Sequence, residues 1–453
     1  MTNSSRVDPS RQVAYDVLRA VAERDAYVNL TLPVLLRERQ ITGRDAAFAT
    51  ELTHGTIRRQ GSYDPVIDSL LRTPVEPPVR DLLRLGTHQL LSMRVPAHAA
   101  VATTVELTRA NVGERPVRLV NAVLRRVGRM RLSSWMDKLA PPRTDATMLD
   151  HLATVHSHPV WMVAALRDAL GGDMAEVEAM LRADNDPPGV TLVARPGRAT
   201  AQELVDAGAG PGRWSPYAAH WNGGDPGSLP AVRESRAGVQ DEGSQLVAQA
   251  LADAKLDGPD AAWLDLCAGP GGKAALLAGL ADGRGASLLA SERQPHRARL
   301  VRQALRGGPG VRGVVCADGT RPAWRAGAFD RVLADVPCTG MGALRRRPEA
   351  RWRRSPGDLA GLTALQRALL RSAIDSCRAG GVVAYVTCSP HPAETTGVVD
   401  DVLRDRGDVV QEDARALLPD VPDLGAGPAV QLWPHRHGTD AMFLAALRRT
   451  GDG

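Results

Sequence analysis

The stretch AAWLDLCAGPGGKAALLA, residues 261–278, decides the fold of the C-terminal half of this chain. Its first residues predict a short buried strand, and a glycine-rich turn then leads into an apolar helical segment. Glycines are needed where the backbone turns sharply and approaches a ligand, with the amide groups of the helix start directed at it. The spacing matches neither Gly-x-Gly-x-x-Gly nor a P-loop. It therefore predicts a cofactor-binding loop and disfavours dinucleotide and nucleoside triphosphate sites.

Short apolar strands alternate with helical segments around this loop. They read ASLLASE (286–292), VRGVVCAD (311–318), FDRVLADVP (329–337) and GGVVAYVTCS (380–389). This alternation is typical of a doubly wound, Rossmann-like α/β sheet, and we assign it to residues 237–453. Residues 1–138 show helical periodicity, for example at Val13, Val17 and Val21, and predict an all-α bundle. Between them, 139–236 predict a linker, LAPPRTDAT, and a small α+β connector.

Composition limits the class of protein. A chain of 453 residues exceeds the size of a single hydrophobic core, so we expect several domains. A net charge of +5, mainly from arginine, favours a polyanionic partner, although a GC-rich genome would give the same bias. The five cysteines contain no CxxC pair and no zinc-like spacing, which predicts free thiols and no metal. Without a signal-like N-terminus or a long apolar run, we expect a cytoplasmic protein with no membrane partner.

Two acidic residues follow the next predicted strands. Glu292 ends the second strand, where a doubly wound fold places a carboxylate that binds ribose hydroxyls. Asp318 ends the third strand, in a position to meet an adenine amino group. Either acid alone could be an ordinary helix N-cap. Together, and after this loop, they favour an adenosyl ligand.

Two cysteines follow the fourth and fifth strands, Cys338 in DVPCTG and Cys388 in TCS. The carboxyl ends of parallel strands form one ligand-binding edge, so we expect both thiols to face one pocket. Such thiols suit methylation of cytosine, whose carbon 5 becomes reactive only after a thiolate adds to carbon 6. Asp335 could hold the N3 and N4 edge of the base. Cys316 and Cys377 are expected to be inert, and Cys267 to form part of the loop wall.

These motifs resemble the Sun family of RNA cytosine-5 methyltransferases. The resemblance covers GVQDEGSQLV, LDLCAGPGGKAALLA, ADVPCTGMGALRRRPEARW, YVTCSPHPAE and VQLWPHRHGTDAMF. It implies that Cys388 is the nucleophile, that Cys338 assists product release and that Asp335 contacts the base. It also implies that S-adenosyl-L-methionine is held by Cys267, Ala268, Gly269, Pro270, Gly271, Gly272, Lys273, Glu292, Asp318 and Asp335.

The N-terminal region is similar to the RNA-binding protein NusB, in FATELTHGTIRRQ, LRLGTHQLL and LVNAVLRRV. This fusion implies that the RNA is 16S ribosomal RNA or a small-subunit assembly intermediate. Three alternatives stay open: a transfer RNA substrate, a catalytically idle RNA-binding assembly factor, and a thiol-dependent oxidoreductase that would have to bind NAD. The sequence identifies neither the cytosine nor the oligomeric state.

A basic run follows the Cys338 motif and carries an embedded aromatic residue. Such a run can hold phosphates and stack a base, whereas in isolation it is more often a solvated loop. We expect RNA contacts from Arg345, Arg346, Arg347, Arg351, Trp352 and Arg353. A weaker candidate surface in the N-terminal region comprises Arg58, Arg59, Arg115, Arg118, Arg125 and Arg126. His435 and His437 have no accompanying ligand cluster and do not predict a metal site.

Overall fold

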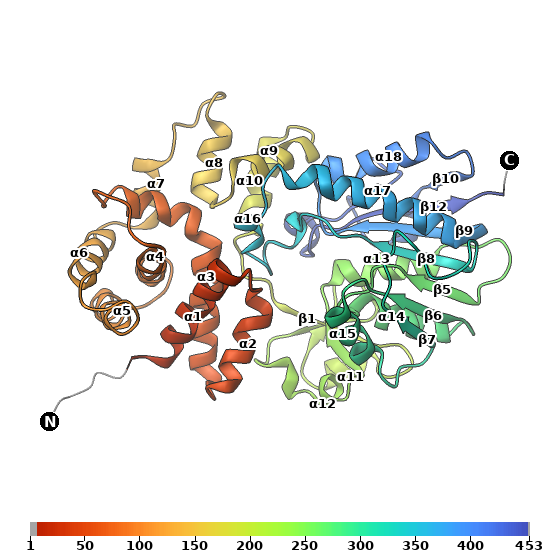
Figure 1. Cartoon of the computed structure of the whole chain (residues 1–453), viewed down its shortest axis with the longest axis horizontal. Coiled ribbons are helices and arrows are strands. Elements are labelled where there is room, and N and C mark those ends of the chain that lie inside the picture. The colour runs from red at the N-terminus through yellow and green to blue at the C-terminus, as the bar shows by residue number, and fades with distance from the viewer. Residues whose placement is uncertain (1–6, 452–453) are drawn as a thin grey trace. The chain divides into compact units, whose positions relative to one another are not determined.

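The computed structural model describes residues 7–451, which form two compact units (Figure 1). The helical unit contains the chain up to Pro187 together with Leu344–Arg353, and the sheet unit contains Pro188–Ala343 and the chain from Arg354 onward. Among the described residues, no helix is long and apolar enough to cross a membrane.

The helical unit confirms the predicted all-α bundle. Its helices are α1 (Pro9–Arg24), α2 (Val28–Glu38), α3 (Gly43–Asp68), α4 (Pro77–Leu91), α5 (Ala97–Asn111), α6 (Val117–Val127), α7 (Leu132–Leu139), α8 (Met148–His156), α9 (Val160–Ala169), α10 (Met174–Ala183) and the short α16 (Ala350–Arg353). The apolar stripe predicted at Val13 and Val17 lies in the core between α1, α3 and α4. The side chain of Asp8 caps α1 by accepting a hydrogen bond from the amide of Arg11 at 2.9 Å.

The predicted connector, residues 139–236, does not form one module, because the structure divides it between the two units. Its first part packs in the helical unit, where Ser62 donates to the carbonyl of Thr154 at 2.7 Å and the amide of Gly61 donates to Ser157 Oγ at 2.9 Å. The second part, from Pro188, enters the sheet unit. Turn signals mark where loops occur, but packing partners decide the unit to which each helix belongs.

The sheet unit begins with a small antiparallel sheet of order β2-β3-β1-β4. Its strands are β1 (Val190–Ala194), β2 (Gly210–Pro211), β3 (Ala218–Trp221) and β4 (Ala237–Val239), with the helices α11 (Ala201–Asp206) and α12 (Pro230–Arg233) between them. The strand β1 is central because it pairs with both β3 and β4.

The large sheet has the order β10-β12-β9-β8-β5-β6-β7, and β11 pairs with β12. Its strands are β5 (Ala262–Asp265), β6 (Ser287–Ser291), β7 (Val311–Val315), β8 (Phe329–Asp335), β9 (Cys377–Thr387), β10 (Val409–Glu412), β11 (Val430–Gln431) and β12 (Phe443–Arg449). The strands β7, β6, β5, β8 and β9 are parallel neighbours in this order. The strand β12 is antiparallel to β9, and β10 is antiparallel to β12. The chain order reverses direction between β5 and β8, which confirms the predicted doubly wound topology.

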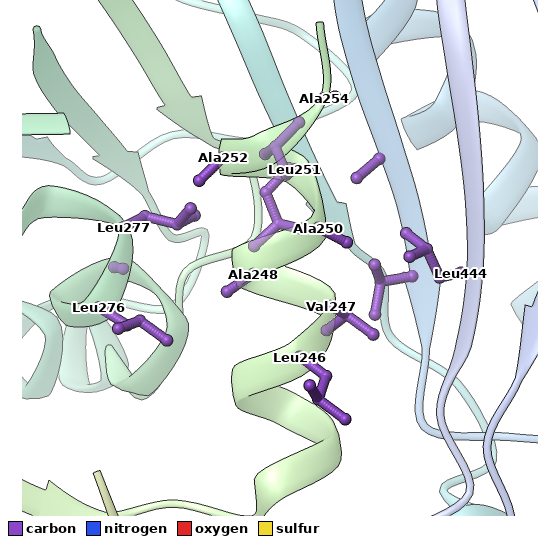
Figure 2. Packing of buried hydrophobic residues seen from close by; sticks show 14 of the residues in the cluster. Leu246, Val247, Ala248, Ala250, Leu251, Ala252, Ala254, Leu276, Leu277 and Leu444 are labelled. Carbon is purple, nitrogen blue, oxygen red and sulfur yellow. The ribbon is translucent and has the colours of Figure 1, made fainter. Parts of the chain in front are cut away.

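Both faces of this sheet are covered by helices: α13 (Glu242–Asp253), α14 (Gly272–Asp282), α15 (Pro295–Leu305), α17 (Asp358–Ser376) and α18 (Thr396–Arg404). The short helix α19 (Pro434–His437) lies between β11 and β12 in the chain. Neighbouring residues of β5 point to opposite faces, so that Trp263 joins the α13 and α14 core and Leu264 joins the α17 and α18 core. Figure 2 shows Leu251 and Leu277 in the first of these cores. Two-sided burial explains why the strands read as continuous apolar runs.

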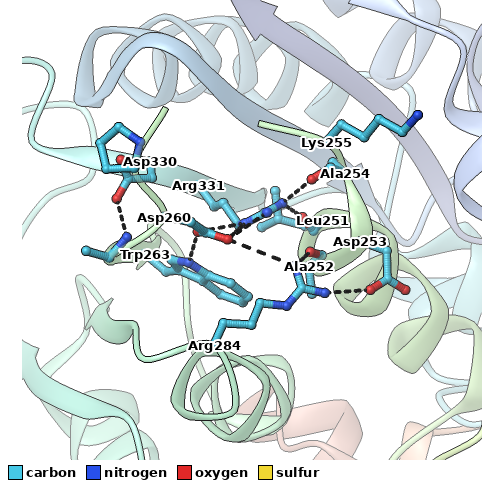
Figure 3. Close-up of polar contacts among 12 residues, drawn as sticks. Leu251, Ala252, Asp253, Ala254, Lys255, Asp260, Trp263, Arg284, Asp330 and Arg331 are labelled. Atoms are coloured by element: carbon cyan, nitrogen blue, oxygen red, sulfur yellow. Dashed lines mark hydrogen bonds and ion pairs between the residues drawn. The ribbon is translucent and has the colours of Figure 1, made fainter. Parts of the chain in front are cut away.

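A polar cluster ties the amino ends of β5 and β8 together (Figure 3). The buried guanidinium of Arg331 bonds to the carboxylate of Asp260 and donates to the carbonyl of Leu251 at 2.7 Å. Asp330 accepts from the amides of Ala261 and Ala262 at 2.8 and 2.7 Å. These bonds lie at the end of the sheet opposite to the predicted site.

Candidate active site at the carboxyl edge of the sheet

The loop between β5 and α14 has the tight backbone that its glycines predict. Gly271 has φ +108°, and a Cβ there would lie 2.7 Å from the side chain of Ala304. A Cβ on Gly269 would lie 2.1 Å from Oε2 of Glu292. Only glycine fits either position without displacing a neighbour. The loop therefore passes close to the side chain of Glu292, as expected for a shared ligand site.

Glu292 and Asp318 follow β6 and β7 at the same edge of the sheet. Glu292 accepts hydrogen bonds from the amides of Gly269 and Gln294 at 3.1 and 2.8 Å, which fix its carboxylate beside the loop. Asp318 accepts from the amide and the hydroxyl of Thr320, and these two bonds lower the pKa of its carboxyl. Two acidic residues at successive strand ends match the pattern that binds ribose and adenine.

Two buried polar side chains beside the loop have few or no hydrogen-bond partners: Asp265 has at most a weak contact with the backbone of Cys267, and Gln240 has none among the described residues. Burial, reinforced by the nearby Asp335, raises the pKa of Asp265 to about 8. The Cδ of Gln240 would lie 3.8 Å from a Cβ on Gly272. Because buried polar groups are normally hydrogen-bonded, these two groups fit a polar ligand such as S-adenosylmethionine. Gln240 was not predicted as a site residue, although it lies in the motif GVQDEGSQLV.

The two predicted cysteines meet. Cys338 follows β8 and Cys388 follows β9, which are parallel neighbours, and their Sγ atoms are 3.4 Å apart. The hydrogen bond with Cys388, together with burial, raises the pKa of the Cys338 thiol well above its usual value. Cys338 is therefore a neutral thiol at physiological pH. Cys316 is exposed at the end of β7, and Cys377 is buried at the start of β9, away from this edge.

Lys273 and Asp335 form an ion pair in the same place. Lys273 Nζ donates to Asp335 Oδ2 at 2.9 Å and to Ser244 Oγ at 3.2 Å. Burial alone would lower the pKa of Lys273, but the Asp335 carboxylate outweighs it, Cys388 adds to the effect, and the pKa is raised. Lys273 is thus a permanent cation close to Cys388. The loop residue predicted to bind cofactor is also joined to the residue predicted to bind the base.

Glu394, which the sequence analysis did not single out, holds the two cysteine loops together. Its buried carboxylate accepts from the amide of Thr339 at 2.8 Å and from the hydroxyls of Thr339 and Ser389. Gln366 Nε2 donates to the same carboxylate at 3.0 Å. Thr339 directly follows Cys338, and Ser389 directly follows Cys388. The signal available in the sequence was an acidic residue at the end of YVTCSPHPAE.

A glycine fixes the same pair of loops from the other side. The amide of Gly342 donates to the carbonyl of Cys388 at 2.8 Å, and a Cβ on Gly342 would lie 2.1 Å from the carbonyl oxygen of Ala441. Backbone and side-chain bonds therefore hold the two cysteine loops next to each other.

The predicted RNA-contact run needs correction. Arg351 is completely buried in the helical unit, where it donates to the carbonyls of Arg58, Ser157 and Asp184 and to the side chain of Asn185. Trp352 Nε1 donates to the carbonyl of Ile57 at 2.9 Å. Complete burial in the helical unit therefore removes Arg351 from the surface available to RNA. Trp352 is half-buried, and its contact with RNA stays a prediction.

Neighbouring residues of this run differ in exposure. Arg353 donates to the carbonyl of Ala26 and stacks over the ring of Tyr27 at 4.8 Å, which is also an intramolecular role. Arg345 is buried, Arg346 is half-buried and Arg347 is exposed. RNA contact by Arg346 and Arg347 stays a prediction. A basic run with an aromatic residue has the same pattern whether it meets RNA or threads into a helical bundle.

Comparison with known proteins identifies the family of this chain. A family model described as "16S rRNA methyltransferase RsmB/F" matches residues 254–448, and one described as "NusB family" matches residues 8–129. "Putative methyltransferase MT1451" of Mycobacterium tuberculosis is 55% identical over 448 residues, covering 98% of this chain and 97% of that protein. The chain belongs to the RsmB/F methyltransferase family.

Two further similarities extend over the full length. "Probable ribosomal RNA small subunit methyltransferase B" of Synechocystis is 30% identical, covering 97% of this chain and 99% of that protein. The crystal structure of PH0851 has a TM-score of 0.80 at 20% identity, covering 98% of this chain and 99% of that chain, and shows the same fold. As an RsmB/F member, the protein is an RNA methyltransferase that uses S-adenosyl-L-methionine. The predicted family, NusB-like region and cofactor are confirmed.

Proposed function

We propose that this enzyme methylates carbon 5 of a cytosine in 16S ribosomal RNA through a covalent adduct between Cys388 and carbon 6 of the base. The observation that carries the proposal is the pair of thiols, 3.4 Å apart, at the sheet edge that also holds the glycine loop. A single buried cysteine would have an ordinary packing role. The 16S target is supported by the family description and by the name of the Synechocystis relative.

The chemistry follows from the electron demand of cytosine. The thiolate of Cys388 forms a bond to carbon 6, and the electron pair displaced from the ring makes carbon 5 nucleophilic. When bound, S-adenosylmethionine would supply the methyl group to carbon 5, and its sulfur–methyl bond would break to leave S-adenosylhomocysteine. A base then removes the proton from carbon 5, the sulfur–carbon bond breaks, and its electron pair returns to Cys388. The ring regains aromaticity and carries one additional methyl group.

The neighbouring side chains have roles that fit this sequence. Cys338 is a thiol beside Cys388, so it can donate a hydrogen bond to the attacking sulfur and assist its release. Lys273 holds Asp335 through Oδ2, which leaves Oδ1 to accept from the N4 or protonated N3 of cytosine. Glu292 and Asp318 hold the adenosyl part of the cofactor, with the backbone of residues 267–273 beside them. Glu394 keeps the two thiols adjacent and contacts neither ligand.

The test is transfer of labelled methyl from S-adenosylmethionine to 16S RNA, followed by digestion to nucleosides. We expect wild type to yield 5-methylcytidine, Cys388→Ala to yield none, and Cys338→Ala to accumulate a protein–RNA adduct that survives denaturing electrophoresis. Cys377→Ala is the matched control, because Cys377 lies at the amino end of β9, away from the site, and its loss should leave methyl transfer unchanged.

The other outcomes are equally decisive. Label in transfer RNA but not in 16S RNA would move the substrate to the first alternative, and label on neither would favour an idle assembly factor. Full activity of Cys388→Ala would reject the covalent mechanism even if the product were 5-methylcytidine.

A further inference from the structure

Helix α6 of the helical unit is sharply two-sided. Its buried face consists of Val117, Val120, Val123, Leu124 and Val127. These residues pack against α4 and α5, and α6 lies beside these two helices in Figure 1. At 100° per residue, they occupy an arc of about 120°. The opposite arc faces solvent.

That exposed face is lined with arginine. The cations in and beside α6 are Arg115, Arg118, Arg125, Arg126, Arg129 and Arg131, and all six are exposed. Residues 115–136 contain no aspartate or glutamate. The remaining exposed positions of the helix, Leu119 and Ala122, are small or apolar, so nothing on this face neutralises the charge. We call these six arginines the α6 arginine face.

The α6 arginine face differs from other arginines of the same unit. Among the described residues, none of its members forms an ion pair, and Arg125 makes a side-chain hydrogen bond only to Asn121, at 3.1 Å. By contrast, Arg39 pairs with Asp16 at 2.5 Å and Arg167 pairs with Asp168 at 2.8 Å. Unpaired like charges fixed on one helix repel one another. Such an arrangement is relieved when a polyanion neutralises it.

We propose that the α6 arginine face is a docking surface for the phosphate backbone of the RNA substrate. Arg118 and Arg126 are about 12 Å apart along the helix axis, at 1.5 Å per residue, a span that covers successive phosphates of one strand. Guanidinium groups bind phosphate oxygens through paired hydrogen bonds. A lipid surface fits less well, because the exposed face offers only Leu119 and Ala122 for insertion.

This inference rests on the RNA substrate of the proposed function and adds a binding surface that the catalytic chemistry does not use. Phosphate contacts position an RNA without reading its sequence. The α6 arginine face should therefore contribute affinity for many RNAs, while the choice of cytosine is made at the cysteines. Loss of the face should raise KM and leave kcat at saturating RNA unchanged.

The test compares two variants of the full-length enzyme with equal loss of charge. Arg118→Gln/Arg125→Gln removes two members of the face. Arg39→Gln/Arg167→Gln removes two ion-paired arginines of the same unit, one exposed and one half-buried. Glutamine preserves helix propensity and all four sites are on the surface, so both proteins should fold. Binding of a 16S RNA fragment is measured by filter retention at several KCl concentrations, and methyl transfer is measured in parallel.

We expect the α6 variant to bind about 10- to 100-fold more weakly and its log–log salt slope to fall by roughly 1.5–2. The control should stay within about twofold of wild type. Equal weakening of both variants would show a general effect of net charge and overturn the proposal. Unchanged RNA binding by the α6 variant would also overturn it and indicate an acidic protein as the partner of this face. Because wild-type binding is measured directly, failure of methylation alone would count against the proposed function and not against this surface.

Discussion

Replacing Glu394 by glutamine should separate the stability of the active-site loops from that of the sheet unit as a whole. The Glu394 carboxylate accepts two hydrogen bonds at each oxygen, from Thr339 N and Gln366 at Oε1 and from the hydroxyls of Thr339 and Ser389 at Oε2. In Glu394→Gln the hydroxyls can rotate to accept from the new NH2 group, so each bond survives in neutral form. Charge-assisted bonds are roughly twice as strong as neutral ones, and the four together should lose about 2–4 kcal/mol.

The matched control is Asp330→Asn at the opposite end of β8. Asp330 is as deeply buried and accepts from the amides of Ala261 and Ala262 and from Arg378. We expect both variants to lower the apparent melting temperature by roughly 5–12 °C. Only Glu394→Gln should reduce kcat, because only that change loosens the Cys338–Cys388 pair. The reasoning is refuted if Glu394→Gln turns over at the wild-type rate well below its melting temperature, or if Asp330→Asn loses as much activity.

Three further predictions follow from buried groups. Arg351→Met leaves several carbonyls without a donor and should lower the free energy of unfolding of the helical unit by about 3–5 kcal/mol. Chemical denaturation measures this loss. The control Arg347→Met, at an exposed site, should lower the free energy of unfolding by less than about 0.5 kcal/mol. The pKa of Asp265 is about 8 in the fold against 3.8 when exposed, so the stability from its protonated form is complete below pH 4 and is lost as the pH rises towards 8. The free energy of unfolding of the cofactor-free protein should therefore decline across this pH range, and Asp265→Asn should flatten the decline. Parallel curves of unfolding free energy against pH for the two proteins would contradict the assignment. The oxidant diamide should form a disulfide between Cys338 and Cys388, because their sulfurs need to close only from 3.4 Å to about 2 Å. Peptide mass spectrometry should detect this disulfide, and an activity assay should show a loss that added thiol reverses. Oxidation confined to Cys316 would count against the prediction.

The site residues at strand ends could be predicted, because the spacing of apolar residues locates each strand and the site residue directly follows it. Continuous apolar runs separated by helical segments indicate a parallel sheet buried on both faces, and the carboxyl ends of such strands share one edge. This logic placed Glu292, Asp335, Cys338 and Cys388 together, and the structure has them along β6, β8 and β9 of one sheet. The glycine loop then indicated a cofactor site, and the two cysteines indicated methylation of a cytosine through a thiolate.

Residues that act through partners distant in the sequence could not be predicted in the same way. Glu394 binds Thr339, 55 positions earlier, and Arg351 binds the carbonyl of Arg58, 293 positions earlier. No local pattern encodes either contact. For the same reason, the sequence did not reveal that Arg351 would be buried, and Arg351 was predicted to contact RNA.

The sequence by itself determined the class of fold, the cofactor loop and the pair of cysteines, because these depend on the period of apolar residues and on short motifs that act locally. Only the tertiary structure decided how far apart the two sulfurs lie, which carboxylate holds their loops and which arginines reach solvent. Those properties depend on which segments pack against each other. Packing is a sum over contacts between residues remote in the chain, and the identity of a single residue does not reveal its partner.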